Sequence, residues 1–278
     1  MPTFVTPQPI AAAVEVAGAQ VRVTATDRTD TRVLVEPIDP ANRKHVKVAE
    51  NTKIEYADGE LQVKTKTAGD KSGSVTITID LPTGSGLVAH LAFSELHTEG
   101  SLGASELHLA SGRVDLDHVG SLKASLASGQ VAIGHIAGHA EIDGAAFGMR
   151  IGEIAGTVGI SSAGGQTWIG HASGDLELNS ASGDFAIDRA DGSVNASTAS
   201  GAIRIGRMTN GQAKLKNASG NIEVGISEGT AVSVDADSER GAVHNFVLSH
   251  AKPGPADARV SLYARTRHGD VTIQRAAS

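Results

Sequence analysis

Histidines and charged residues recur at one spacing along the central part of the sequence. Six residues after each glycine of a repeated series, or five after Gly148, stand His118, His135, Glu153, His171, Arg189 and Arg207. On successive strands these side chains would form one column, with neighbours about 4.8 Å apart. Imidazole and carboxylate groups are ligand types for transition metals. We expect an exposed polar turn without metal, because arginines share the column and no closed ligand set is evident. Whether the histidines and the glutamate bind anything stays open.

The sole tryptophan is the second chemically distinctive residue. In the segment GGQTWIG, alternation with the inward Ile169 turns Trp168 outward, beside Arg150 or Met149 on the preceding strand. An arginine stacked on an exposed indole is worth about 0.5–1 kcal/mol, and both types are enriched at the centres of protein interfaces. We therefore predict Trp168, Arg150 and His171 as partner-binding residues. The alternative is that caps or loops bury Trp168, as large aromatics are highly buried on average.

The sequence gives little support for catalysis. It has no GxxxxGK[ST], HExxH or GxSxG motif, no GxGxxG after a strand, and no cysteine. Glycoside hydrolysis needs two carboxylates in a cleft, which a solenoid builds by lengthening certain turns. The repeats here vary only from 17 to 19 residues. The turns also lack the paired glycines of calcium-binding β-rolls. We predict a protein that is not an enzyme and has no cofactor and no metal.

An internal repeat predicts the fold. The tripeptide Ala-Ser-Gly, or a close variant, places its glycine at 112, 129, 148, 165, 183, 201 and 220, with a mean step of 18 residues. Each repeat contains two segments with alternating apolar and polar residues, typical of half-buried strands. Two short strands and two turns, here called a coil, bury their apolar faces only by stacking on neighbouring coils. The sequence predicts an all-β, single-chain parallel β-solenoid of about seven coils.

Less regular β-rich segments flank the repeats, and we expect them to cap the solenoid. The predicted division is an N-terminal cap at 1–92, solenoid repeats at 93–236 and a C-terminal cap at 237–278. Pro40–Glu50 is expected to contain a short helix and Lys252–Pro255 to form a loop. The terminal HGDVTI is similar to the repeat itself.

Composition agrees with a thin, layered structure. Hydrophobic residues make up 40% of the chain but aromatics only 3%, so a dense core requires backbone walls that lie close together. The net charge of −7 and the lack of a basic cluster argue against nucleic acid as a partner. There is no basic, apolar leader and no apolar stretch of ~18 residues. We expect no transmembrane segment and a cytoplasmic location.

The opening MPTFVTPQPI, the segment ATDRTDTRVLVEPIDP, the elements SGDLEL, GGQTWIG and IGEIAG, and the final HGDVTIQR carry a family resemblance. Over essentially the whole chain, the sequence resembles the bacterial "putative adhesin" family of β-strand-repeat domains of unknown function. That resemblance implies a β-solenoid but no activity or ligand. We expect a non-catalytic scaffold or protein-interaction module, with another protein as partner and association of further copies left open. The alternatives are an envelope-associated adhesin or stress-response component and, ranked third, a carbohydrate-active enzyme.

Overall fold

The computed structural model describes residues 2–65, 73–247 and 258–276. These residues form an all-β protein, as predicted, with one helix among them, α1 (Arg43–Glu50). The side chain of Asn42 accepts a hydrogen bond from the backbone N–H of Lys44, which caps this helix in the segment where it was expected. No helix of the described chain has the length and apolar character to cross a membrane. The chain forms two compact units, 1–144 and 145–278, and each is described by itself.

Within the described residues, the first unit begins with strands in which buried and exposed residues mostly alternate. They are β1 (Thr3–Val5), β2 (Ala11–Ala17), β3 (Ala19–Thr26), β4 (Asp30–Pro37), β5 (Thr52–Ala57), β6 (Glu60–Thr65) and β7 (Val75–Pro82). β8 (Gly86–Glu99) and β9 (Ser101–Ile136) follow, and β9 is long enough for two repeats. β2 pairs in parallel with both β6 and β8, and β3 with both β7 and β8. Residues 11–26 therefore lie between segments that follow them in the sequence.

Antiparallel pairs also occur at the start of the first unit. β1 pairs with β4, β4 with β7 and β5 with β6 in this sense, so the sheet is mixed. A purely parallel arrangement does not extend to these strands. The count of seven coils stays a prediction. The predicted domain boundaries also stay predictions, although β8 runs across residues 92 and 93.

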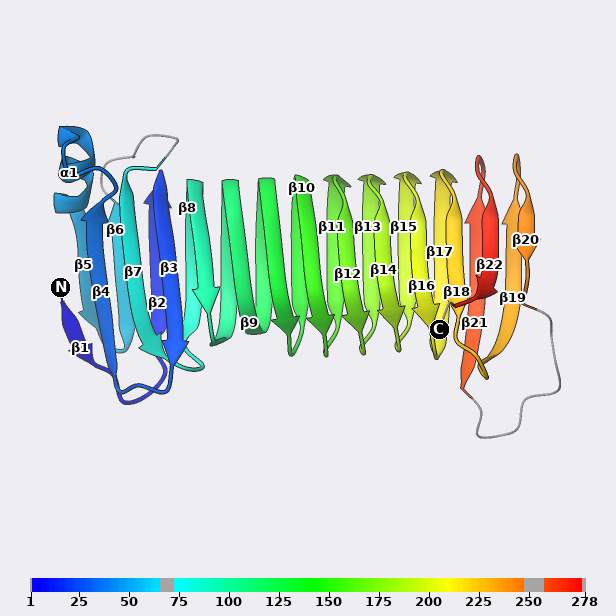
Figure 1. The fold of residues 1–278 in the computed structure, drawn as a ribbon, viewed down its shortest axis with the longest axis horizontal. Coiled ribbons are helices and arrows are strands. Elements are labelled where there is room, and N and C mark those ends of the chain that lie inside the picture. Colours follow the sequence, from blue (N-terminus) through cyan, green and yellow to red (C-terminus); the bar gives the residue numbers. More distant parts are fainter. Residues whose placement is uncertain (1, 66–72, 248–257, 277–278) are drawn as a thin grey trace. The chain divides into compact units, whose positions relative to one another are not determined.

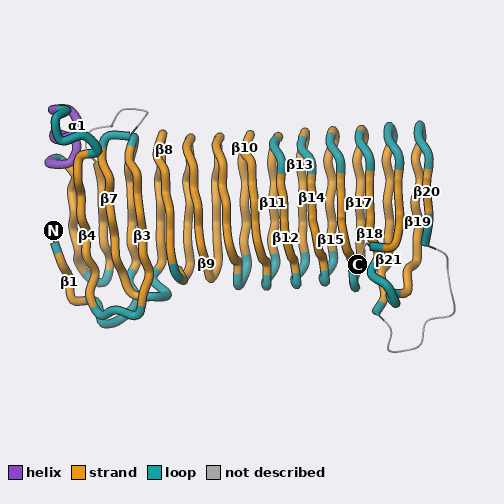
Figure 2. The backbone as a smooth tube through the Cα atoms, viewed as in Figure 1, coloured by secondary structure: helices purple, strands orange, loops and turns teal. Residues whose placement is uncertain are grey.

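The second unit contains short strands joined by short turns (Figures 1 and 2). It includes the end of β10 (Ala140–Ile154), followed by β11 (Val158–Gly164), β12 (Thr167–Ala172), β13 (Leu176–Ser182), β14 (Phe185–Ala190), β15 (Val194–Ser200), β16 (Ile203–Met208), β17 (Gly211–Ser219) and β18 (Ile222–Ile226). Parallel pairs join β10, β12, β14, β16 and β18 in one series and β11, β13, β15 and β17 in the other. Most paired residues are 18 positions apart, as in Ile169↔Ile187. The repeat length therefore equals the step from one strand to its neighbour.

The final strands lie out of sequence order. β21 (Arg259–Thr266) pairs in parallel with β17 and with β19 (Ala231–Ser238), and β22 (Val271–Arg275) pairs with β18 and with β20 (Val243–Asn245). The terminal HGDVTI thus behaves as a coil, with Val271 opposite Ile222. The sequence suggested that the C-terminal segment forms an outer cover. Residues 259–275 lie instead between other strands. The loop expected at Lys252–Pro255 lies outside the described residues.

The inward positions of the second unit are filled by aliphatic side chains. Leu178, Ala196, Ile205 and Val224 are at most 1% exposed, as alternation predicts. The same alternation would place Val232 and Val234 inside, but they are only half-buried. Within the described chain their strand, β19, has a neighbour on one side only, namely β21. Among the residues that the structure describes, no further coil covers the other flank of β19.

Glycines stand where coils approach most closely. A Cβ on Gly183 would lie 2.2 Å from the carbonyl oxygen of Gly165, and one on Gly170 would lie 2.6 Å from that of Gly152. Glycines such as Gly170 and Gly206 lie within strands and have no positive φ, so they are not turn residues that need a left-handed backbone. Close packing of backbone on backbone is the reason for glycine there.

Aspartates at the coil corners bind the next coil. Asp175 Oδ1 accepts a hydrogen bond from the backbone N–H of Ser193 at 2.8 Å, and Asp184 Oδ1 accepts one from Ala202 at 2.8 Å. Each bond joins residues 18 positions apart in the sequence. It gives a hydrogen-bond acceptor to a backbone N–H group that the strand pairing leaves without one. These two carboxylates, which lie near each other in the sequence, thus stabilise the stacking of coils.

Candidate interaction surface at Trp168

Trp168 lies on the outer face of β12, as the alternation predicts. Its sequence neighbours Thr167 and Ile169 are 4% and 0% exposed, while Trp168 itself is half-buried. The parallel register pairs it with Arg150 on β10 and with Ala186 on β14. The guanidinium carbon of Arg150 lies 4.0 Å from the centroid of the indole ring. Arginine therefore covers one face of the ring, in the cation–π geometry.

Two further residues fix the orientation of the indole. Its Nε1–H donates a hydrogen bond to Asp188 Oδ1 on β14 at 3.2 Å. Cη2 of the ring lies 3.0 Å from the position that a Cβ on Gly170 would occupy. A side chain at residue 170 would therefore displace the ring. The ring of Trp168 is thus restrained by Arg150, Asp188 and the backbone at Gly170, and such rigidity lowers the entropy lost on binding.

A polar cluster adjoins Trp168 and is centred on Asp191. The carboxylate accepts hydrogen bonds from Arg189 Nε at 3.0 Å and Thr209 Oγ1 at 2.6 Å, and His171 Nε2 lies 2.8 Å away. The other ring nitrogen of His171 faces Glu153 Oε1 at 3.9 Å. The predicted column Glu153, His171, Arg189 is observed in register.

The electrostatics of this cluster favour an ionised Asp191. Partial burial acts to raise its pKa, but the hydrogen bonds from Arg189, Thr209 and His171 outweigh burial and lower the pKa to about 2. The negative charge is therefore retained over the whole neutral range. With its partners in place, Asp191 holds a fixed negative charge directly after β14.

The other half of the predicted histidine column lies in the first unit. The rings of His118 and His135 are 5.5 Å apart and tilted by 37°, and His118 Nδ1 lies 2.9 Å from Asp117 Oδ1. Within residues 2–65, 73–247 and 258–276, no group of three or more histidine or acidic side chains has the geometry to hold a metal ion. The histidines are thus brought together as a pair, without a third ligand.

The structure pairs Arg150 with Trp168 and places His171 on the same strand as Trp168, three residues further on, beside Asp191. Sequence reasoning missed Asp188 and Asp191 as members of this surface. Both stand 20 residues after the side chain they bind, which is one coil plus two positions along the strand. An acidic residue at that offset from an outward tryptophan or histidine is the signal that could have identified them.

Comparisons with known proteins found similar solved structures and one matching family model. Solved structures that resemble the chain include a "putative adhesin" from Bacteroides fragilis, with 14% identity, a TM-score of 0.42, and coverage of 98% of this chain and 95% of that one. Another "putative adhesin", from Parabacteroides distasonis, has 14% identity, a TM-score of 0.45, and coverage of 99% and 95%. No curated protein matches. A family model described as Toastrack DUF4097 matches residues 12–274. The chain therefore belongs to the Toastrack DUF4097 family, whose domains are of unknown function.

Proposed function

We propose that the protein is a non-catalytic β-solenoid scaffold that binds another protein through the surface around Trp168. One observation carries the proposal: a half-exposed tryptophan stacked under Arg150 and hydrogen-bonded to Asp188. Tryptophan and arginine are the residue types that dominate the energetics of protein interfaces. A ring already held in one orientation loses little rotamer freedom when a partner covers it.

The ionic residues beside Trp168 support the same proposal. Arg189 and His171 are both bonded to Asp191, so their charges and donors have defined positions on the two strands that carry Trp168 and Ala186. Interfaces combine a central anchor with a polar rim of this kind. The surface offers a partner one aromatic anchor and a rim of both charge signs.

Retention of partners on immobilised protein tests this function. We expect at least one protein from a lysate of the source organism to be retained by wild type and lost with Trp168→Ala and with Arg150→Ala. Arg204→Ala is the matched control, since Arg204 is an exposed arginine at the equivalent strand position, three coils beyond Arg150 and two beyond Trp168. A retained set that is identical for all four proteins would refute the Trp168 surface as the binding site.

An envelope-associated adhesin or stress-response component is the alternative function, and it is compatible with the family. The two proposals differ in where the protein is located, because the leading proposal places it in the cytoplasm. Fractionation of the source organism with an antibody against this chain distinguishes them: recovery in the envelope fraction favours the alternative.

A further inference from the structure

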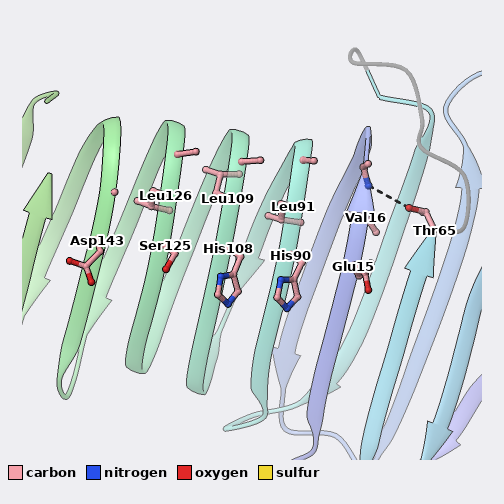
Figure 3. Close-up of a pocket in the computed structure, with 15 residues that line it drawn as sticks. Glu15, Val16, Thr65, His90, Leu91, His108, Leu109, Ser125, Leu126 and Asp143 are labelled. Carbon is pink, nitrogen blue, oxygen red and sulfur yellow. Dashed lines mark hydrogen bonds between the residues drawn. The ribbon is translucent and has the colours of Figure 1, made fainter. Parts of the chain in front are cut away.

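A shallow groove crosses the strands of the first unit. Its volume is ≈ 730 Å³, within the range of small-ligand sites. Its floor is apolar and includes Val16, Leu91, Leu109 and Leu126. Successive strands carry a row of outward side chains along it (Figure 3), namely Glu15, His90, His108, Ser125 and Asp143.

Two imidazole rings form a flat wall within this row. His90 and His108 are paired in register on β8 and β9, and their rings are stacked with centroids 4.4 Å apart and an interplanar angle of 1°. His108 Nε2 lies 2.8 Å from Glu106 Oε1, which restrains the ring in this plane. One face of His108 is covered by His90. The other face points along the row toward Ser125 (Figure 3).

The small side chain of Ser125 leaves a slot beside that free face. Leu122 N–H donates to the His139 carbonyl at 3.1 Å, a register that places Asp143 next to Ser125 on the following strand. His108 and Asp143 are then separated by two strand spacings, about 9.6 Å. A planar group stacked on a ring needs about 3.5 Å. The slot over Ser125 therefore has space for one planar layer between the imidazole and the carboxylate.

Charge decides which planar group fits. In the described part of the chain, Asp143 is exposed and makes no hydrogen bond or ion pair, whereas Glu15, at the other end of the row, is paired with Lys64. A neutral aromatic ring would stack on His108 but leave Asp143 unpaired. An ammonium group would pair with Asp143 but has no flat face. A guanidinium group does both, since it is planar, always charged and suited to carboxylates.

We propose that the slot over Ser125 binds an arginine side chain of a protein partner. The guanidinium stacks on His108 and pairs with Asp143, while its aliphatic stem lies over the apolar floor at Leu126. This site lies in the first unit and is independent of the surface proposed around Trp168. A partner segment that runs across the strands would place its other residues along the same groove.

NMR titration with N-acetyl-L-argininamide tests the proposal on the full chain. The probes for comparison are the citrulline analogue, which keeps the planar shape without the charge, and the lysine analogue, which keeps the charge without the plane. Histidine ring signals are followed, with that of His108 assigned from a His108→Gln variant. We expect a saturable shift of the His108 signal with the arginine probe and at least ~5-fold weaker binding of both analogues. Equal affinities for the three probes, or no saturable shift, would overturn the proposal.

Two variants locate the binding site. Asp143→Asn removes the charge and Ser125→Leu fills the slot, and each is expected to weaken binding of the arginine probe at least ~5-fold. Lys123→Leu is the matched control, because Lys123 is exposed on the same strand two residues before Ser125. It should leave the affinity unchanged, and unchanged melting temperatures establish that all three variants fold. Full binding by both Asp143→Asn and Ser125→Leu would exclude the slot.

Discussion

The guanidinium carbon of Arg150 lies 4.0 Å from the centroid of the Trp168 ring, and the two residues are paired on neighbouring parallel strands. The stacking thus follows from the 18-residue repeat, which brings every residue beside the one a coil earlier. On the other flank the partner is Ala186, whose methyl group covers little of the indole. The ring is therefore shielded mainly from one side.

Removing the stacked arginine is expected to expose the tryptophan. Arg150→Ala should increase acrylamide quenching of the single tryptophan emission and lower the free energy of unfolding by about 0.5–1 kcal/mol. Arg204→Ala, which removes an exposed arginine from the same column, should change neither quantity. Quenching that is unaffected by Arg150→Ala would mean that the stacked geometry is not populated in solution.

The register around Trp168 was predictable because the repeat is nearly constant and the alternation has period two. Those two regularities place Arg150, Trp168 and Ala186 in one row without any knowledge of side-chain rotamers. The hydrogen bonds of Asp188 and Asp191 were not predictable in the same way. They join side chains one coil and two positions apart, and such diagonal contacts depend on rotamers that spacing does not determine.

The order of the final strands also could not be predicted from the sequence. The similarity of HGDVTI to the repeat indicates a coil, and Val271 is indeed buried opposite Ile222. A coil that pairs in parallel on both edges has the same pattern wherever it stands in the stack. Nothing in the alternation therefore placed β21 between β17 and β19.

The narrow core predicts a strong dependence on side-chain size. Ala196 is 0% exposed and pairs with Leu178 and Leu215 on its two sides, so Ala196→Phe should lower the free energy of unfolding by ~1–3 kcal/mol or more through overpacking. Lys214→Gln, at an exposed position of the neighbouring strand, should stay within ~0.5 kcal/mol. Urea unfolding followed by tryptophan fluorescence measures both. Equal losses would mean that the inward and outward faces are misassigned.

We expect Asp191 to make a pH-dependent contribution to the free energy of unfolding. Its pKa in the folded protein is about 2, against about 3.9 in an unfolded chain, so the folded state favours the ionised form. The stabilisation is fully present above pH ~4 and is lost as the pH falls through ~2. The side chain of Asp191 is one-quarter exposed, so solvent screens part of its interactions. We therefore expect Asp191→Asn to lower the free energy of unfolding by about 1–2 kcal/mol at pH 7.

Unfolding of wild type and variant at several pH values measures this contribution. The difference between Asp191→Asn and wild type should shrink between pH 4 and pH 2, because wild-type Asp191 then becomes protonated. Glu177→Gln serves as a control, since Glu177 is exposed on a neighbouring strand, and it should stay within ~0.5 kcal/mol at pH 7. A difference for Asp191→Asn that is constant with pH would contradict the ionic role of this residue.

The histidine pair of the first unit is expected not to bind metal. The rings of His118 and His135 are tilted by 37° to each other, and the carboxylate of Asp117 lies 2.9 Å from His118 Nδ1. Addition of Zn²⁺, Ni²⁺ or Ca²⁺ should leave the melting temperature unchanged, whereas a ligand at 100 times its Kd would stabilise by ~2.7 kcal/mol. A saturable rise that is absent from the His118→Ala, His135→Ala double variant would establish a metal site.

The glycines of the Ala-Ser-Gly series stand at positions where we expect the repeat to tolerate no side chain. Gly165 has φ of +112°, and a Cβ there would lie 1.9 Å from the carbonyl oxygen of Phe147. That oxygen belongs to the backbone of the neighbouring coil, so it cannot move without disturbing the pairing of Met149 with Thr167. Gly229 lies in the same unit and also has positive φ, +76°, but a Cβ there would meet nothing within 4 Å.

Comparison of Gly165→Ala with Gly229→Ala separates contact from backbone strain. Both variants carry the cost of placing alanine at positive φ, about 1–3 kcal/mol. Gly165→Ala should lose a further ~1–3 kcal/mol, because its methyl group overpacks the space between two coils. Urea unfolding followed by the emission of Trp168, in the same unit, gives both values. If Gly229→Ala were as destabilising as Gly165→Ala, backbone conformation alone would explain the glycine of the repeat, and the close approach of neighbouring coils would not.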